Sequence, residues 1–184
     1  MKKAVIPAVV LALFAGLGCD LFSIPPDGGG DGQDEWQEPL TPRAVIEDIE
    51  YCYNTANYPY YTILLDEDNF VFYFDPNDVQ EFGLPTSWTY NEEITATEKL
   101  FDAVGASNID LALDFSGCGN TEPDPNVTTF DIDNVAYTLR VTVPDKDLIY
   151  LAQAHANFEL SKFEEEDTHL MRWWLTKWWD MVTG

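Results

Sequence analysis

Two histidines and many carboxylates are the side chains best suited to acid–base chemistry in this 184-residue chain. Such chemistry in an apolar cavity needs a group whose pKa is shifted by burial. His155 lies on the polar side of an alternating stretch and His169 follows an acidic run, so we expect both at the surface. Asp110 and Asp114 alternate outward from the apolar side of their strand. The sequence therefore assigns no catalytic residue.

Oxygen ligands for a metal occur in two acidic segments, residues 66–68 and 131–134. Neither segment is followed by the glycine and the distal glutamate of a calcium-binding loop. Cys52 and Cys118 do not have the spacing of zinc ligands with the two histidines. We therefore predict neither a metal site nor another cofactor.

The charge balance excludes some partners. Nine Lys and Arg residues stand against 33 Asp and Glu residues, which gives a formal net charge of -24. Such a surface repels the phosphates of nucleic acids and anionic lipid headgroups. We expect no nucleic acid partner, and the scattered acids favour simple solubility.

The first 19 residues carry a targeting pattern. Lys2 and Lys3 precede an apolar run over residues 4–14, which is short for a permanent membrane span. Small residues and then Cys19 follow, and together these features resemble a bacterial lipoprotein signal peptide. Gly16 departs from the pattern, because lipoproteins usually have leucine three residues before the cysteine.

The resemblance implies cleavage before Cys19, lipidation of this cysteine and anchoring in the bacterial cell envelope, with the domain outside the cytoplasm. An ordinary secretory signal cut elsewhere, or a membrane anchor, is the alternative. Residues 1–18 are then the signal peptide, residues 19–40 an acidic tether rich in glycine and proline, and residues 41–184 a folded domain.

If Cys19 carries lipid, Cys52 and Cys118 have only each other as disulfide partners in an exported protein. The alternative is that Cys52 is a small buried residue on its helix and Cys118 is a free thiol in a loop. Both readings stay open from the sequence.

The domain begins with helical signals. Thr41-Pro42 is a cap followed by proline at the first helical position, and a second short helix is expected over residues 58–65. An aromatic strand over residues 70–74 ends at a turn over residues 75–78. A capping box at residues 89–92 predicts a third helix that ends at Gly105.

After residue 105 the apolar period changes from helical to two. We expect four strands over residues 109–115, 135–143, 149–163 and 169–182. In the last strand the period places Trp173 with Leu175 and Trp174 on the opposite side. Four of the six tryptophans lie in it, so we expect an interior strand with helices against the face of Trp173.

This order of elements, with Trp88 before a helix and the closing pattern Trp173-x-Leu175-x-x-Trp178-x-Asp180, resembles the nuclear-transport-factor-2-like (SnoaL-like) superfamily. The resemblance implies an α+β fold, in which a curved and mainly antiparallel sheet wraps three N-terminal helices into a cone. Such cones hold an apolar cavity in isomerases, dehydratases and small-molecule binders, so the fold does not choose the function. No catalytic residue of those enzymes can be carried over.

Six aromatic residues are candidates for lining that cavity. They are Tyr53, Tyr73, Trp88, Phe101, Tyr137 and Trp173. The alternative is that they fill a solid core. Trp174 and Trp179 on the outer face are candidates for the interface of a homodimer.

Three functions follow from these patterns. The first is an envelope lipoprotein whose domain binds a small molecule or a partner protein. The second is an enzyme of the isomerase or dehydratase type, acting on a small hydrophobic substrate. The third is a purely structural surface lipoprotein. A buried ionisable group at the cavity floor would favour the enzyme, an apolar cavity without such a group would favour binding, and a filled cone would favour the structural role.

Overall fold

The computed structural model describes residues 40–164 and 169–181, so the predicted signal peptide, Cys19 and nearly all of the predicted tether lie outside the described residues. In chain order the helices and strands are α2 (Pro42–Thr55), α3 (Tyr58–Leu64), β1 (Val71–Tyr73), α4 (Pro76–Phe82), β2 (Ser87–Thr89), α5 (Tyr90–Val104), β3 (Ile109–Asp114), β4 (Thr129–Val143), β5 (Leu148–Glu164) and β6 (Met171–Met181). Short 3-10 helices span Ala106–Asn108 and Pro144–Lys146.

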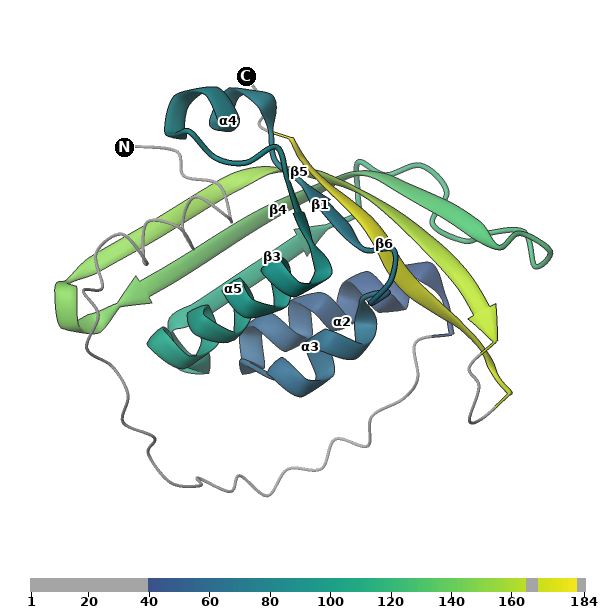
Figure 1. The fold of residues 1–184 in the computed structure, drawn as a ribbon, viewed down its shortest axis with the longest axis horizontal. Coiled ribbons are helices and arrows are strands. Elements are labelled where there is room, and N and C mark those ends of the chain that lie inside the picture. The colour runs from purple at the N-terminus through teal and green to yellow at the C-terminus, as the bar shows by residue number, and fades with distance from the viewer. Residues whose placement is uncertain (1–39, 165–168, 182–184) are drawn as a thin grey trace.

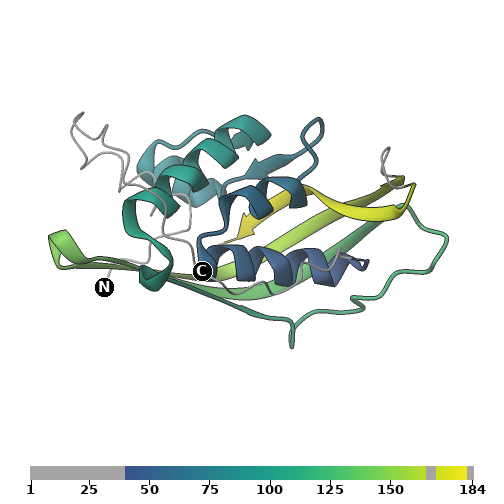
Figure 2. The ribbon, with the colours of Figure 1, turned by 90° about the horizontal axis from the view of Figure 1, so that it is seen from below.

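The six strands form one sheet in the order β2-β1-β6-β5-β4-β3. Its neighbouring strands are antiparallel except for β1 and β6, which are parallel. Figures 1 and 2 show α2, α3 and α5 together on one face of the curved sheet. The predicted α+β fold with a curved, mainly antiparallel sheet is confirmed. The prediction that the last strand is interior is confirmed too, because β6 lies between β1 and β5.

The helices form where the sequence signals them. The Thr41 hydroxyl accepts a hydrogen bond from the backbone N–H of Ala44 at the start of α2. Glu92 accepts from the backbone N–H of Thr89 at 2.8 Å and completes the capping box of α5. Both helices bury an apolar stripe against the sheet, which in α2 includes Val45 and Ile49.

A bulge in β6 decides which of its side chains face the helices. Thr176 has no cross-strand partner in β5, because the pairing shifts by one residue there. Trp173 and Leu175 are buried before the bulge, and Trp178 and Asp180 are buried after it. A strict two-residue alternation would have put Trp178 and Asp180 on the outer face.

A second bulge lies in β4, where the pairing shifts between Ile132 and Val135. Asn134 adopts a left-handed backbone conformation with φ of 61°, which asparagine tolerates better than most residues. The bulge leaves Ile132 and Val135 buried and keeps Asp131 and Asp133 exposed on the outer face. The two acids therefore point away from the helices.

The structure corrects one prediction in the first half of the domain. Residues 75–78 do not form a simple turn, because Asp75 caps a helix and Pro76 takes its first position. The Asp75 carboxylate accepts a hydrogen bond from the backbone N–H of Asn77 at 2.7 Å. The sequence reading also missed the short strand β2.

The disulfide considered from the sequence is not formed, because Cys52 and Cys118 are both free. Cys52 is buried near the end of α2. The backbone N–H of Cys118 donates to the Phe115 carbonyl, and the Phe115 ring lies 4.7 Å from the Arg43 guanidinium at the start of the same helix. Arg43 and Cys52 are nine positions apart along α2, which is about 13 Å at 1.5 Å per residue, so Cys118 lies near the opposite end of this helix from Cys52.

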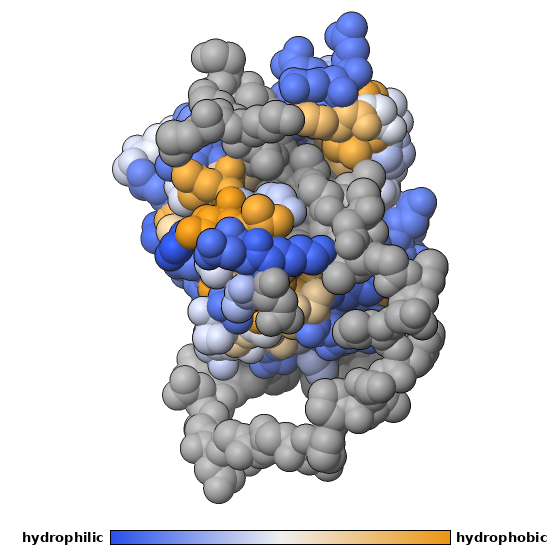
Figure 3. All heavy atoms as spheres, turned by 90° about the vertical axis from the view of Figure 1, so that its left-hand side faces the viewer, coloured by the Kyte–Doolittle hydropathy of each residue, from blue (hydrophilic) through white to orange (hydrophobic). Residues whose placement is uncertain are grey.

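Exposed apolar side chains mark one end of the molecule. Leu148 and Ile149 lie at the tip of the β4–β5 hairpin and are 43% and 59% exposed. Figure 3 looks onto this end, where apolar side chains lie beside strongly hydrophilic ones. Within residues 40–164 and 169–181, no helix has the length and apolar character needed to cross a membrane.

Candidate ligand-binding groove

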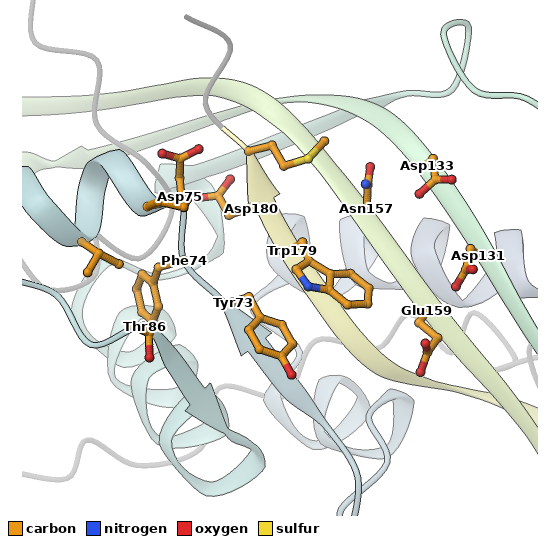
Figure 4. Close-up of a pocket in the computed structure, with 13 residues that line it drawn as sticks. Tyr73, Phe74, Asp75, Thr86, Asp131, Asp133, Asn157, Glu159, Trp179 and Asp180 are labelled. Atoms are coloured by element: carbon orange, nitrogen blue, oxygen red, sulfur yellow. The ribbon is translucent and has the colours of Figure 1, made fainter.

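A groove of about 910 Å³ opens where the ends of β1 and β6 meet the start of α4, and its lining combines outer-face residues such as Trp179 and Asp131 with the buried inner-face residues Phe74 and Asp180. Its walls come from β4, β5, β6 and β1 and from the start of α4. Five of its 13 lining residues are aspartate or glutamate, and none is lysine or arginine. Figure 4 shows Tyr73 and Trp179 between two groups of carboxylates. The groove is thus an acidic site with an aromatic floor.

The aromatic floor follows from the pairing of β1 with β6. Tyr73 lies beside Trp179 in the parallel register, and the two rings stack with centroids 5.4 Å apart and an interplanar angle of 7°. Both side chains are half-buried, so part of the ring surface stays open to the groove. Stacked rings of this kind form a flat apolar surface for a ligand.

At one end of the groove, like charges face each other across two strands. Asp131 of β4 and Glu159 of β5 are direct cross-strand partners, an arrangement that is unfavourable for two carboxylates. Burial and the nearby charges of Glu159 and Asp133 raise the pKa of Asp131.

One cation borders this end. The Lys177 ammonium donates to Glu159 at 2.7 Å and lies 5.9 Å from the centroid of the Trp179 ring. It supplies a single positive charge against the carboxylates of Asp131, Asp133 and Glu159. Its position shows that an ammonium group fits between a carboxylate and an aromatic ring here.

At the other end of the groove lies Asp180, which is only 4% exposed. Its Oδ1 atom accepts a hydrogen bond from the Tyr137 hydroxyl at 2.6 Å. Among the described residues, its buried Oδ2 atom has no hydrogen-bond partner of good geometry, although the nearby backbone N–H of Met181 also lowers the pKa of this carboxyl group. Burial raises the pKa of Asp180 to about 7, against the lowering effect of the Tyr137 hydrogen bond.

The pair of Tyr137 and Asp180 spans the strand between them. Tyr137 lies on β4 and Asp180 on β6, and the β5 residues opposite them are Ala154 and Ala156. Small side chains on β5 leave room for the tyrosine ring to reach across to the carboxylate.

Two more carboxylates accompany Asp180. Asp75 and Asp78 of the α4 segment are both buried, and their charges add to the raised pKa of Asp180. Burial first and the charge of Asp75 second raise the pKa of Asp78 to about 6. The described residues contain no group of three or more His, Cys, Asp or Glu side chains arranged to hold a metal ion.

A second buried carboxylate lies among the helices. Glu93 of α5 accepts hydrogen bonds from the Tyr61 hydroxyl at 2.8 Å and from the Thr97 hydroxyl at 3.2 Å. Burial raises its pKa to about 7, against the lowering effect of these bonds. Tyr53, Tyr61 and Phe101 pack edge-on with centroids 5.3–6.3 Å apart. These rings fill the space between the helices around Glu93.

The six candidate lining residues lie in three places. Tyr73 lines the groove, and Trp88 lines a smaller depression of about 330 Å³ beside α5. The other four are buried in the hydrophobic core, namely Tyr53, Phe101, Tyr137 and Trp173. Tyr137 reaches the groove indirectly, through its hydrogen bond to Asp180.

Of the remaining positions expected at the surface, Asp110, Asp114 and His169 are exposed and His155 is not fully so. Asp110 and Asp114 are exposed on β3, and His169 is exposed beside Glu164. His155 faces the outer side of β5 but is half-buried, and its Nδ1 atom is buried, so the prediction of a surface histidine holds only in part. None of these side chains lines the groove.

Comparison with known proteins gives the fold. No family model matches the chain, and no curated protein sequence matches it either. A conserved protein from Planctomyces limnophilus is similar in structure, with a TM-score of 0.56, 14% identity, and coverage of 77% of this chain and 92% of that chain. A ketosteroid isomerase-like protein from Erwinia carotovora atroseptica has a TM-score of 0.53 and 14% identity, with 81% and 100% of the two chains covered.

The described residues therefore have a nuclear-transport-factor-2-like fold, as the resemblance of the sequence implied. At these sequence identities the structural similarity establishes the fold alone, so the function has to be argued from the residues of the site.

Proposed function

We propose that this domain binds a small organic molecule in the groove beside α4. The observation that carries the proposal is the open stack of Tyr73 on Trp179 inside a groove of about 910 Å³. Ligand sites commonly combine such an apolar surface with a few polar groups that orient the ligand. Here the polar groups are the carboxylates at the two ends of the groove.

We further propose that a lipid on Cys19 holds the domain outside the cytoplasm at a bacterial membrane. The support comes from the sequence, in the basic residues, short apolar run and cysteine of residues 1–19. The groove would then sample solutes of the envelope.

A fragment screen by NMR tests the binding proposal. We expect fragments from a library of neutral, cationic and anionic compounds to shift the indole N–H resonance of Trp179 and the backbone resonance of Asn157. Trp179→Ala should abolish binding, whereas Trp174→Ala on the same outer face should not. If no fragment of any charge shifts these resonances, the groove is not a ligand site.

A second candidate function is catalysis of the isomerase type, favoured by Asp180. This carboxylate lines the groove and has a pKa of about 7, which suits a group that takes and returns a proton near neutral pH. The name of the Erwinia neighbour, ketosteroid isomerase-like, points to the same chemistry.

Cyclohex-3-en-1-one is a simple probe for this candidate. Asp180 would remove a proton from the carbon between the carbonyl and the double bond, and return it at the far alkene carbon to give the conjugated enone. Ultraviolet absorbance follows that product. Asp180→Asn should abolish the acceleration and Asp110→Asn should preserve it. A rate equal to that of buffer would exclude this reaction for this substrate.

A further inference from the structure

We propose that two copies of this chain join through a free edge of β5, where residues 148–154 of one copy pair antiparallel with the same residues of the other. The pairing would merge two six-stranded sheets into one continuous sheet. None of these residues lines the groove, so the inference does not depend on the proposed binding function.

The free edge exists because β5 is longer than β6. The pairing of these two strands ends where Met181 lies opposite His155, and from there back to the hairpin tip at Leu148, β5 pairs with β4 alone. Figure 1 shows the β4–β5 hairpin extending beyond the end of β6. Within residues 40–164 and 169–181, no hydrogen bond reaches the backbone of residues 148–154 from the side away from β4. Alternate residues of this stretch therefore present their N–H and C=O groups to a further strand.

This edge lacks the features that protect most edge strands from pairing. Natural edges usually carry lysine, proline or a bulge. Residues 148–154 contain no charged side chain and no proline, and the two bulges of the sheet lie further along, at residues 132–135 and 159–160. Because the net charge of the chain is -24, two copies repel each other over most of their surface. Along this stretch they can approach without placing carboxylates opposite each other.

A second copy fits this edge because the stretch is complementary to itself. Antiparallel strands match only when residues of the same face lie opposite each other. A pairing centred on Leu151 meets this condition, since Leu151 then faces its own copy on the outer side of the sheet. Large side chains of one copy then lie opposite smaller or polar ones of the other, in the pairs Leu148 with Ala154, Ile149 with Gln153 and Tyr150 with Ala152.

The pairing would also cover apolar surface that a single copy leaves in water. Leu148 and Ile149 are 43% and 59% exposed at the hairpin tip. In the pairing centred on Leu151, the hairpin tip of one copy ends beside Met181, the last residue of β6, in the other. Seven residues extend about 23 Å, and a strand pair of this length by itself buries less than the roughly 1,200–2,000 Å² of a standard stable interface. We therefore expect a dimer that is weak and depends on concentration.

Sedimentation of the purified full-length chain over a hundredfold range of concentration tests the inference. We expect a reversible equilibrium between monomer and dimer. Leu151→Lys should raise the dissociation constant at least tenfold, because it places two ammonium groups opposite each other on the symmetry axis. Ala112→Lys, on the exposed side of β3, makes the same change of charge and should leave the constant unchanged. Trp174→Ala, on the outer face of β6, should leave it unchanged as well.

Chemical crosslinking tests the register without relying on the lysine variant. Leu151→Cys, in a background that carries Cys118→Ser, should join two copies through a short bismaleimide. Gln153→Cys in the same background should not, because its two copies would lie four residues apart, about 13 Å along the strands. Mass spectrometry of the joined peptide identifies the linked positions.

Three results would overturn the inference. The first is a chain that stays monomeric over the whole range of concentration. The second is a dimer that Ala112→Lys or Trp174→Ala weakens as much as Leu151→Lys does, which would place the contact on the outer face. The third comes from hydrogen exchange: equal protection of the amides of residues 148–154 at both ends of the range would show that the chain's own residues cover the edge. Protection that rises with concentration supports the pairing.

Discussion

Trp173 and Trp174 are neighbours on β6 with opposite surroundings. Trp173 is 3% exposed and belongs to the core under the helices, as the two-residue period predicted. Trp174 is half-buried on the other side, where it contacts Phe163 and the Arg172 guanidinium. The two rings therefore report separately on the core and on the outer face.

We expect Trp173→Ala to cost about 3–5 kcal/mol of unfolding free energy, because it removes a large side chain from a packed core. Trp174→Ala should cost less, and it should weaken a homodimer if the outer face forms one. Urea denaturation and analytical ultracentrifugation measure the two effects. A larger loss for Trp174→Ala in a monomer would contradict the assignment of the faces.

The raised pKa of Asp180 makes the free energy of unfolding fall as the pH rises toward 7. Its pKa is about 7 in the folded protein, against an ordinary value of 3.8. Between these values the unfolded chain has lost the proton and the folded chain has kept it, so stability falls as pH rises from about 4 to 7. The groups facing Asp180 are Tyr137 from β4 and Asp75 and Asp78 from α4.

Asp180→Asn should therefore reduce this fall by as much as about 1.4 kcal/mol per pH unit. Glu93, whose pKa is also about 7, leaves a second contribution of the same sign in the variant. Urea titrations between pH 4 and pH 8 measure the difference, with Asp110→Asn as the control. Parallel curves for wild type and Asp180→Asn would show that Asp180 is ionised throughout.

At the scale of elements, β5 carries a row of small side chains on its inner face. Ala152, Ala154 and Ala156 are buried there, and Tyr137 and Asp180 meet over this row. Ala154→Leu should destabilise the domain by about 1–3 kcal/mol through overpacking and should break that hydrogen bond. Gln153→Leu, on the exposed side of the same strand, is the matched control. Urea denaturation and the titration of Asp180 by NMR follow both effects.

The element order could be predicted because each helix has a local start signal and each strand has alternating side chains. Asp75 with Pro76 is such a signal too, but the same residues also suit a turn, so α4 was missed. The predicted boundaries of the elements were less accurate. For example, β4 begins at Thr129, whereas the predicted strand began at Val135.

The groove could not be predicted, because it depends on two bulges and on strand pairings far apart in the sequence. Period two gives the facing of Trp173, but Trp179 and Asp180 come after the extra residue Thr176. One signal was present: the spacing from Leu175 to Trp178 in the closing pattern is three residues, which marks the bulge. Asp131 reaches the groove only through the pairing of β4 with β5.

At the scale of the whole molecule, the proposed anchor and the charge of the chain act in opposite directions at a membrane. The net charge of -24 repels anionic headgroups, so the folded domain has no electrostatic reason to stay at the surface. The residues before the domain would have to supply the attachment. A predicted tether of some twenty residues has a reach of roughly 25 Å, enough to hold the groove clear of the bilayer.

Attachment through lipid predicts that the wild-type chain partitions into the detergent phase of a Triton X-114 extraction and labels with radioactive palmitate. Cys19→Ser removes the acceptor thiol, so the variant should lose the label and leave the membrane fraction or remain unprocessed. Cys118→Ser, which removes a free thiol from the folded domain, should behave as wild type. Equal membrane retention and labelling of Cys19→Ser would show that another segment anchors the protein, because no other cysteine precedes the domain.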